Sequence, residues 1–211
     1  MPAALSSTRG AVLGVVVIVA NLGAVMALSQ DVSDAYRLSA LASWTQQVST
    51  SPLASDVAAV LFFVGCVALA AFARTLSSST LLTPSTTTTW ALRFVVAAAF
   101  TNGVGVLFPL VATRLVFPCA DAACTADASW WLARSLDLDT VFNVLLGVGF
   151  VLLGRGTASR ALGWATTLMG VLLLPVGLQF FTSALAAWLG VAGLLWTLLV
   201  GVWSVMLWRR R

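Results

Sequence analysis

The feature that most constrains this chain is a series of six apolar runs separated by short polar connections. About 20 helical residues, rising 1.5 Å each, cross the roughly 30 Å hydrocarbon core of a bilayer, and the runs have approximately this length. No hydrophilic domain interrupts the series. The sequence therefore predicts an all-α fold, a polytopic transmembrane helix bundle in which residues 1–211 form a single domain. The expected spans are 10–28, 57–73, 90–112, 136–154, 161–180 and 185–208.

Composition agrees with a membrane environment. Hydrophobic residues make up 60% of the chain and charged residues 9%, against about 45–50% and about 25% in soluble domains. A soluble protein of this size cannot bury so much apolar surface, so the lipid bilayer is the first partner that the sequence implies.

Histidine, lysine and glutamate are absent from the sequence. Their absence removes the commonest general base, the commonest transition-metal ligand and the Schiff-base amine. We therefore expect no catalytic, cofactor-binding or metal-binding residue. The arginines are spread along the chain and form no basic face, so we expect no nucleic-acid partner.

The arginine distribution predicts the orientation in the membrane. With the N-terminus inside, eight of the eleven arginines fall on the cytoplasmic side, as the positive-inside rule requires. All seven aspartates fall on the outer side. Both termini are therefore predicted to be cytoplasmic. The inner arginines are Arg9, Arg74, Arg93, Arg155, Arg160, Arg209, Arg210 and Arg211, and the outer ones are Arg37, Arg114 and Arg134.

Three segments carry predictions of their own. The first span is expected to stay in the protein as a helix, with a secretory signal cleaved after Ala27 as the alternative. Residues 31–50 have apolar residues at roughly helical spacing and predict an amphipathic helix on the outer surface, or else an ordered loop. Residues 75–89 are rich in serine and threonine and predict a flexible cytoplasmic connection.

A few polar residues within or beside the spans are predicted to gather in a cluster that opens to the outside. Polar groups in a bilayer turn toward other helices or water-filled cavities. Asp139 and Asn143 share one helix face, and Arg114 is predicted to pair with Asp139 across the connection 115–138. The cluster is interpreted either as a substrate or ion site or as hydrogen bonding that holds helices together, and we favour the second. Its members are Asn102, Arg114, Asp139, Asn143 and Gln179.

Glycine, proline and cysteine add local predictions. Glycines within the spans favour close helix–helix approach, and Pro109 and Pro175 are expected to kink their helices. Cys119 and Cys124 lie in the predicted outer loop, where a disulfide is favoured over free thiols or a redox-active pair. Cys66 is expected to be a small apolar packing residue.

The hairpin at 145–164 carries a resemblance. A glycine-containing apolar helix ends in a short basic loop, and the next helix begins with Leu-Gly. This pattern is similar to hairpins in six-helix bacterial membrane proteins of unassigned activity. The resemblance implies six helices and a bacterial inner membrane, and it brings no functional residue.

Three functions follow from these observations. The favoured one is a non-enzymatic integral membrane protein, free-standing or an accessory subunit, with a protein partner or homo-oligomer in the membrane. The alternative is a transporter of small molecules or ions that uses the outward-facing polar cluster. A membrane thiol oxidoreductase is the third.

Overall fold

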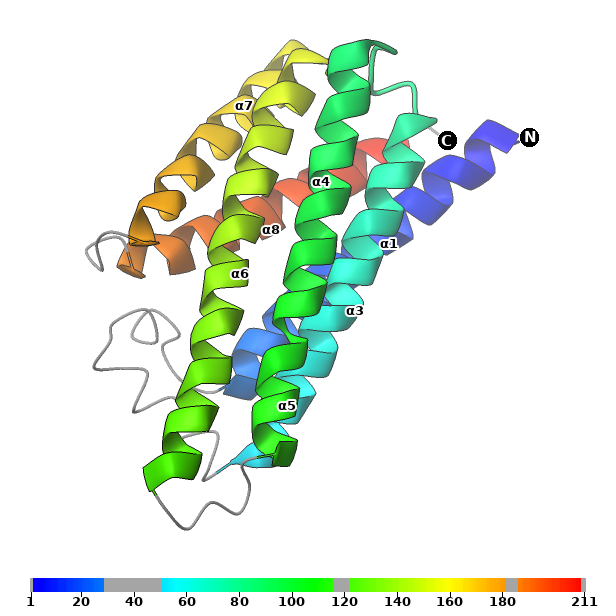
Figure 1. Cartoon of the computed structure of the whole chain (residues 1–211). Helices are drawn as coiled ribbons and strands as arrows, with labels where there is room; N and C mark the ends of the chain where they lie inside the picture. Colours follow the sequence, from blue (N-terminus) through cyan, green and yellow to red (C-terminus); the bar gives the residue numbers. More distant parts are fainter. Residues whose placement is uncertain (1, 29–50, 116–121, 181–185, 210–211) are drawn as a thin grey trace.

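The computed structural model describes residues 2–28, 51–115, 122–180 and 186–209, and regular structure in these ranges is helical (Figure 1). Six helical segments are long and apolar enough to cross a membrane. They confirm the predicted all-α, six-span fold class. The elements are α1 (Pro2–Leu28), α3 (Pro52–Ser77), α4 (Thr86–Gly105), α5 (Leu107–Leu115), α6 (Ala122–Arg155), α7 (Arg160–Leu173), the 3₁₀ helix η2 (Leu174–Phe180) and α8 (Ala186–Arg209).

Two breaks in the helices coincide with the two prolines that were expected to kink them. Proline has no backbone N–H, and its ring clashes with the carbonyl group four residues earlier. For Pro109 that carbonyl belongs to Gly105, where α4 ends, and α5 begins two residues later. Near Pro175, α7 ends at Leu173 and the chain continues as the tighter helix η2. Both prolines therefore coincide with an interruption of the α-helix, and α4 with α5 forms one candidate span.

Helix α6 is longer than the sequence predicted. It covers Ala122–Arg155, whereas the apolar run begins only at residue 136. Hydropathy reports apolar length and not helix length, and the alanine-rich stretch before residue 136 has high helix propensity. Asp137 and Asp139 consequently lie near the middle of a 34-residue helix and not at its start.

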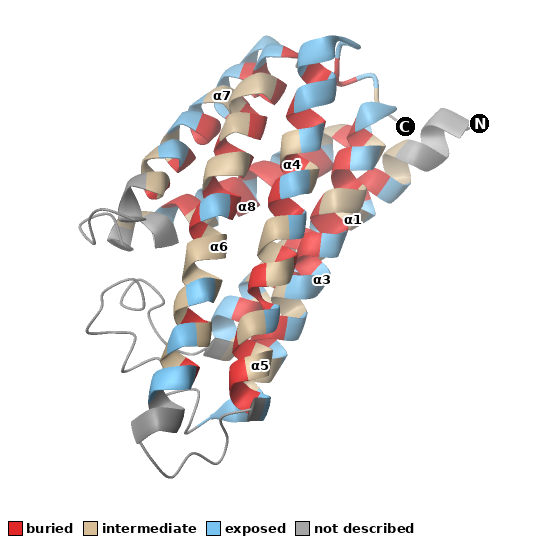
Figure 2. Cartoon of the chain, in the orientation of Figure 1, coloured by how far each residue is buried: buried red, intermediate tan, exposed pale blue. Residues whose placement is uncertain are grey.

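The helices enclose an apolar core and present an apolar outer surface. The closest neighbours are α4 with α6, α1 with α3, α6 with α7 and α1 with α8. Leucines of α6, α7 and α8 fill the interior, among them Leu146, Leu173 and Leu207. Large apolar side chains are also exposed, for example Phe100, 74% exposed, and Trp164, 68% exposed. Exposed positions recur along the helices on the outside of the bundle (Figure 2). Such an exterior is stable only against lipid or another apolar partner.

Helices α6 and α7 cross at glycines on both sides. Gly147 of α6 lies opposite Gly170 of α7, and Gly154 lies opposite Gly163. A Cβ added at Gly170 would lie 2.5 Å from the carbonyl oxygen of Gly147, and one added at Gly163 would lie 2.6 Å from that of Gly154. The two backbones are thus in direct contact, as the glycine content predicted.

The serine- and threonine-rich segment 75–89 is not the free connection that its composition predicted. The Thr83 N–H donates to the Gly156 carbonyl oxygen at 2.8 Å, and the Ala158 N–H donates to that of Leu81 at 2.9 Å. Ser85 caps α4, because its hydroxyl oxygen accepts from the Thr88 N–H at 3.1 Å. The segment therefore ties the α3–α4 connection to the α6–α7 connection at one end of the bundle.

Candidate functional site

The five residues that were predicted to form one polar cluster belong to different places in the bundle. Arg114 lies at the end of α5, in an outer network with α3. Asn102, Asp139 and Asn143 lie deeper, on α4 and α6, beside a cysteine of α3. Gln179 is in η2, and its side chain lies outside the described residues.

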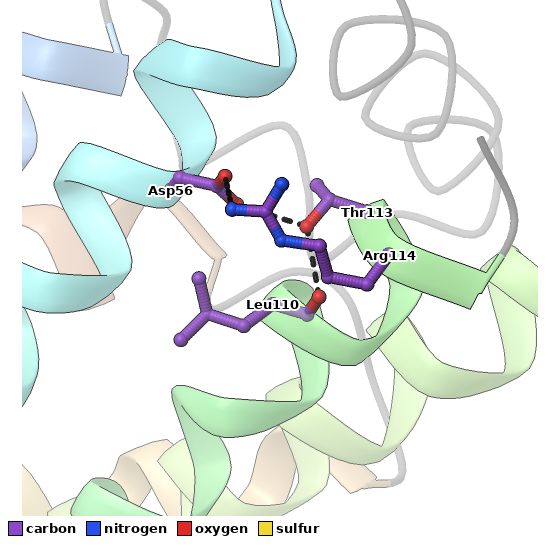
Figure 3. A network of polar contacts seen from close by, with 4 residues as sticks. All are labelled: Asp56, Leu110, Thr113 and Arg114. Carbon is purple, nitrogen blue, oxygen red and sulfur yellow. Dashed lines mark hydrogen bonds and ion pairs between the residues drawn. The ribbon is translucent and has the colours of Figure 1, made fainter. Parts of the chain in front are cut away.

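The outer network joins α5 to the second turn of α3 (Figure 3). Arg114 Nη2 donates to Asp56 Oδ2 at 2.8 Å. The Thr113 hydroxyl lies 2.9 Å from Asp56 Oδ1 and 2.8 Å from the Leu110 carbonyl oxygen, so two acceptors share its proton. The Asp56 side chain is only 16% exposed, while that of Arg114 is 75% exposed. The carboxylate is therefore satisfied on both oxygens, and the guanidinium remains largely in contact with solvent.

The predicted Arg114–Asp139 pair is wrong. A Cβ added at Gly105 of α4 would lie 3.1 Å from Cβ of Leu138, the residue before Asp139. Arg114 is nine residues farther out than Gly105, which is about 14 Å at 1.5 Å per residue. That distance is beyond the reach of the two side chains, and Arg114 pairs with Asp56 of α3 instead. The prediction failed because it placed Asp139 at the start of its helix.

The inner polar group consists of Cys66, Asn102, Asp139 and Asn143. Asn143 is buried, and its Nδ2 donates to the Asp139 backbone carbonyl at 2.8 Å and to Asp139 Oδ2 at 3.2 Å. A Cβ added at Gly103, next to Asn102, would lie 3.7 Å from Cys66 Cβ. One added at Gly105 of the same helix would lie 3.1 Å from Cβ of Leu138, next to Asp139. Helices α3, α4 and α6 therefore each contribute to one group.

The inner polar group lies within the apolar part of the bundle. Asp139 falls inside the candidate span Ala126–Arg155. It lies sixteen residues, or about 24 Å, from Arg155 along the helix axis, while Cys66 lies about 12 Å from Arg74 on α3. The sequence predicted Asp139 at a span end and Cys66 as a packing residue. The thiol is free and buried, as expected of a packing residue, and it lies against α4 next to Asn102.

A second buried polar contact joins α7 to α8. The Trp203 Nε1–H donates to the Thr166 hydroxyl oxygen at 3.1 Å, and that hydroxyl donates to the Leu162 carbonyl oxygen at 2.7 Å. Thr166 is fully buried. Neither residue was predicted from the sequence, because a single threonine or tryptophan within a span carries no signal of its partner. In this contact the hydroxyl accepts one bond and donates another, so its hydrogen-bonding capacity is used inside the bundle.

Several predictions fall outside the described residues. They are the outer helix at 31–50, the position of Cys119 and the side chain of Cys124, so the disulfide stays a prediction. Within the described ranges, no three acidic, cysteine or histidine side chains are grouped so that they could hold a metal ion.

Comparison with known protein families, with curated protein sequences and with solved structures finds no match to this chain. The residues and contacts described above are therefore the basis for the functional proposals.

Proposed function

We propose that the protein is a non-enzymatic multi-pass protein of a bacterial inner membrane, with both termini in the cytoplasm, and that it acts as an accessory subunit of a membrane assembly. One observation carries this proposal. Buried polar side chains bond across helix contacts, as Trp203 of α8 does with Thr166 of α7 and Thr113 of α5 does with Asp56 of α3. Bonds of this kind hold membrane helices together at about 0.6 kcal/mol each on average.

The lateral surface is the part of the molecule left to interact with partners. Large apolar residues on α4 and α7, including Phe100 and Trp164, project outward from the bundle. Shape-matched apolar surfaces associate in a bilayer through van der Waals packing. A companion membrane protein is therefore the partner that this surface fits best.

The test is purification of the tagged chain from its native membrane in mild detergent, followed by native mass spectrometry. The proposal predicts a companion membrane protein in fixed stoichiometry. Phe100→Ala and Trp164→Ala each shorten an exposed side chain without touching the core, and at least one is expected to release the companion while the bundle stays folded. A chain that purifies alone, with or without cross-linking beforehand, would contradict the proposal.

A transporter of small molecules or ions is the second proposal, and the position of Asp139 favours it. A carboxylate within a membrane span is costly and is often part of a substrate or ion path. Cys66 and Asn102 from neighbouring helices provide further polar groups beside it.

Asp137 provides a matched control for this second proposal. It lies two residues from Asp139 on the same helix, but its carboxylate pairs with Arg134 at 2.9 Å and is 38% exposed. In proteoliposomes with a cation or proton gradient, the wild type and Asp137→Asn should dissipate the gradient, whereas Asp139→Asn should not. Equal rates for all three proteins and for empty liposomes would exclude transport of these ions through the inner polar group.

A further inference from the structure

Three exposed arginines are close in sequence to the residues at which α1, α3 and α8 meet. This meeting point is at the end of the bundle that holds both ends of the described chain (Figure 1). A Cβ added at Gly10 of α1 would meet Leu207 of α8 at 2.8 Å and Thr75 of α3 at 2.9 Å. Arg9 precedes Gly10, Arg74 precedes Thr75, and Arg209 follows Leu207 by two residues, and all three are exposed. These residues, Arg9, Arg74 and Arg209, are called the three-arginine cluster below.

Among the described residues, no carboxylate compensates the positive charge of the three-arginine cluster. The ion pairs of the described residues, Arg114 with Asp56 and Arg134 with Asp137, are at the opposite end of the bundle. The carboxylates in the described ranges occur at positions 56, 127, 137 and 139, on the outer or central parts of α3 and α6. The cluster therefore attracts an anion from outside the chain.

The surface next to the cluster is apolar. Val12 of α1 and Val205 of α8 are each more than half exposed, one turn from the arginines toward the middle of the bundle. Trp208, 53% exposed, precedes Arg209, and tryptophan favours the headgroup region of a bilayer. Charge at the membrane edge with apolar surface beneath it matches a phospholipid, which carries an anionic headgroup above acyl chains.

We propose that the three-arginine cluster binds the phosphate of an anionic phospholipid, whose acyl chains lie along α1 and α8. Guanidinium groups form paired hydrogen bonds with phosphate oxygens. Basic sites between transmembrane helices recognise anionic headgroups in this way. The proposal does not depend on the accessory or transport function.

The test uses the full chain in neutral detergent, titrated with phosphatidylglycerol or with phosphatidylcholine of the same acyl chains. Phosphatidylglycerol is expected to raise the melting temperature, and phosphatidylcholine is not. Each arginine replaced by glutamine should lower the phosphatidylglycerol affinity about five-fold, so the triple variant Arg9→Gln, Arg74→Gln, Arg209→Gln should bind about 100-fold more weakly.

A second triple variant controls for net charge. Arg93→Gln, Arg155→Gln, Arg160→Gln removes the same charge from α4, α6 and α7 at the same end, and Arg93 already lies 5.0 Å from the Trp90 ring centre. This variant should keep most of the wild-type affinity. Equal losses in both triple variants, or equal responses to the two lipids, would overturn the proposal.

Two further measurements distinguish a lipid from a soluble anion and cover the case in which the triple variant does not fold. Inorganic phosphate alone should not raise the melting temperature, and a shift equal to that from phosphatidylglycerol would point to a soluble anion and overturn the lipid assignment. If the triple variant does not fold, the three single variants and the salt dependence of the wild type replace it. An affinity that does not fall with added salt would contradict binding through charge.

Discussion

Substituting Gly170 tests the close contact between α6 and α7. A Cβ at this position would lie 2.5 Å from the Gly147 carbonyl oxygen and 2.6 Å from the Val151 amide nitrogen. Ordinary carbon contacts with such atoms are about 1 Å longer, so α7 has to move away from α6 by a comparable distance. Both obstructing atoms belong to backbone, and rotation of a side chain cannot relieve the overlap.

The expected cost follows from two opposing effects. Overpacking of a well-packed interior costs typically about 1–3 kcal/mol, and the higher helix propensity of alanine returns at most about 1 kcal/mol. Gly170→Ala should therefore lower the free energy of unfolding by about 1–2 kcal/mol. For a chain of this size, that corresponds to roughly 2–8 °C in melting temperature.

Gly193 is the matched control for this substitution. It lies within α8, and a Cβ added there meets nothing within 4 Å. Gly193→Ala should leave stability unchanged or raise it slightly. Unfolding of both variants in a detergent titration, followed by circular dichroism, gives the comparison. Equal stabilities for the two variants would refute the direct backbone contact at Gly170.

Three other contacts yield predictions that can be checked in the same way. A double-mutant cycle with Arg114→Ala and Asp56→Ala should give a coupling of about 0.2–1 kcal/mol, because the guanidinium is largely exposed. Strictly additive losses would contradict this coupling. Trp203→Phe removes the donor to a buried hydroxyl and should cost about 1 kcal/mol in the same unfolding titration, and no loss would contradict that bond. If Cys119 and Cys124 form a disulfide, a membrane-impermeant maleimide should label them only after reduction, and ready labelling without reductant would rule the disulfide out.

The fold class was predictable because one physical quantity decides it. Crossing a bilayer requires about 20 apolar residues in a helix, and the sequence displays six such runs. The start of α6 was not predictable in this way, because the stretch before the apolar run is too polar to be recognised as part of a span, although it is helical and includes buried residues such as Leu132. Because the predicted helix began too late, Asp139 was placed several turns too close to the outer end of the bundle, and Arg114 was given the wrong partner.

The polar contacts were only partly predictable. Asn143 and Asp139 are four residues apart, so local helix geometry was enough to place them together. Asp56 meets Arg114 from a helix more than 50 residues away, and the sequence has no feature that reports the register between those helices. The α6–α7 contact is visible in the sequence. Gly147 and Gly154 are seven residues apart before the short loop, and Gly163 and Gly170 are seven residues apart after it.

The most direct test of this account is the membrane topology of the intact chain. Fluorescent-protein and alkaline-phosphatase reporters, fused in turn after Arg211 and beside Cys119, report the cytoplasmic and outer sides respectively. Six spans with the arginine-rich end inside predict fluorescence at the C-terminus and phosphatase activity beside Cys119. Phosphatase activity at the C-terminus, or fluorescence at both sites, would contradict the account.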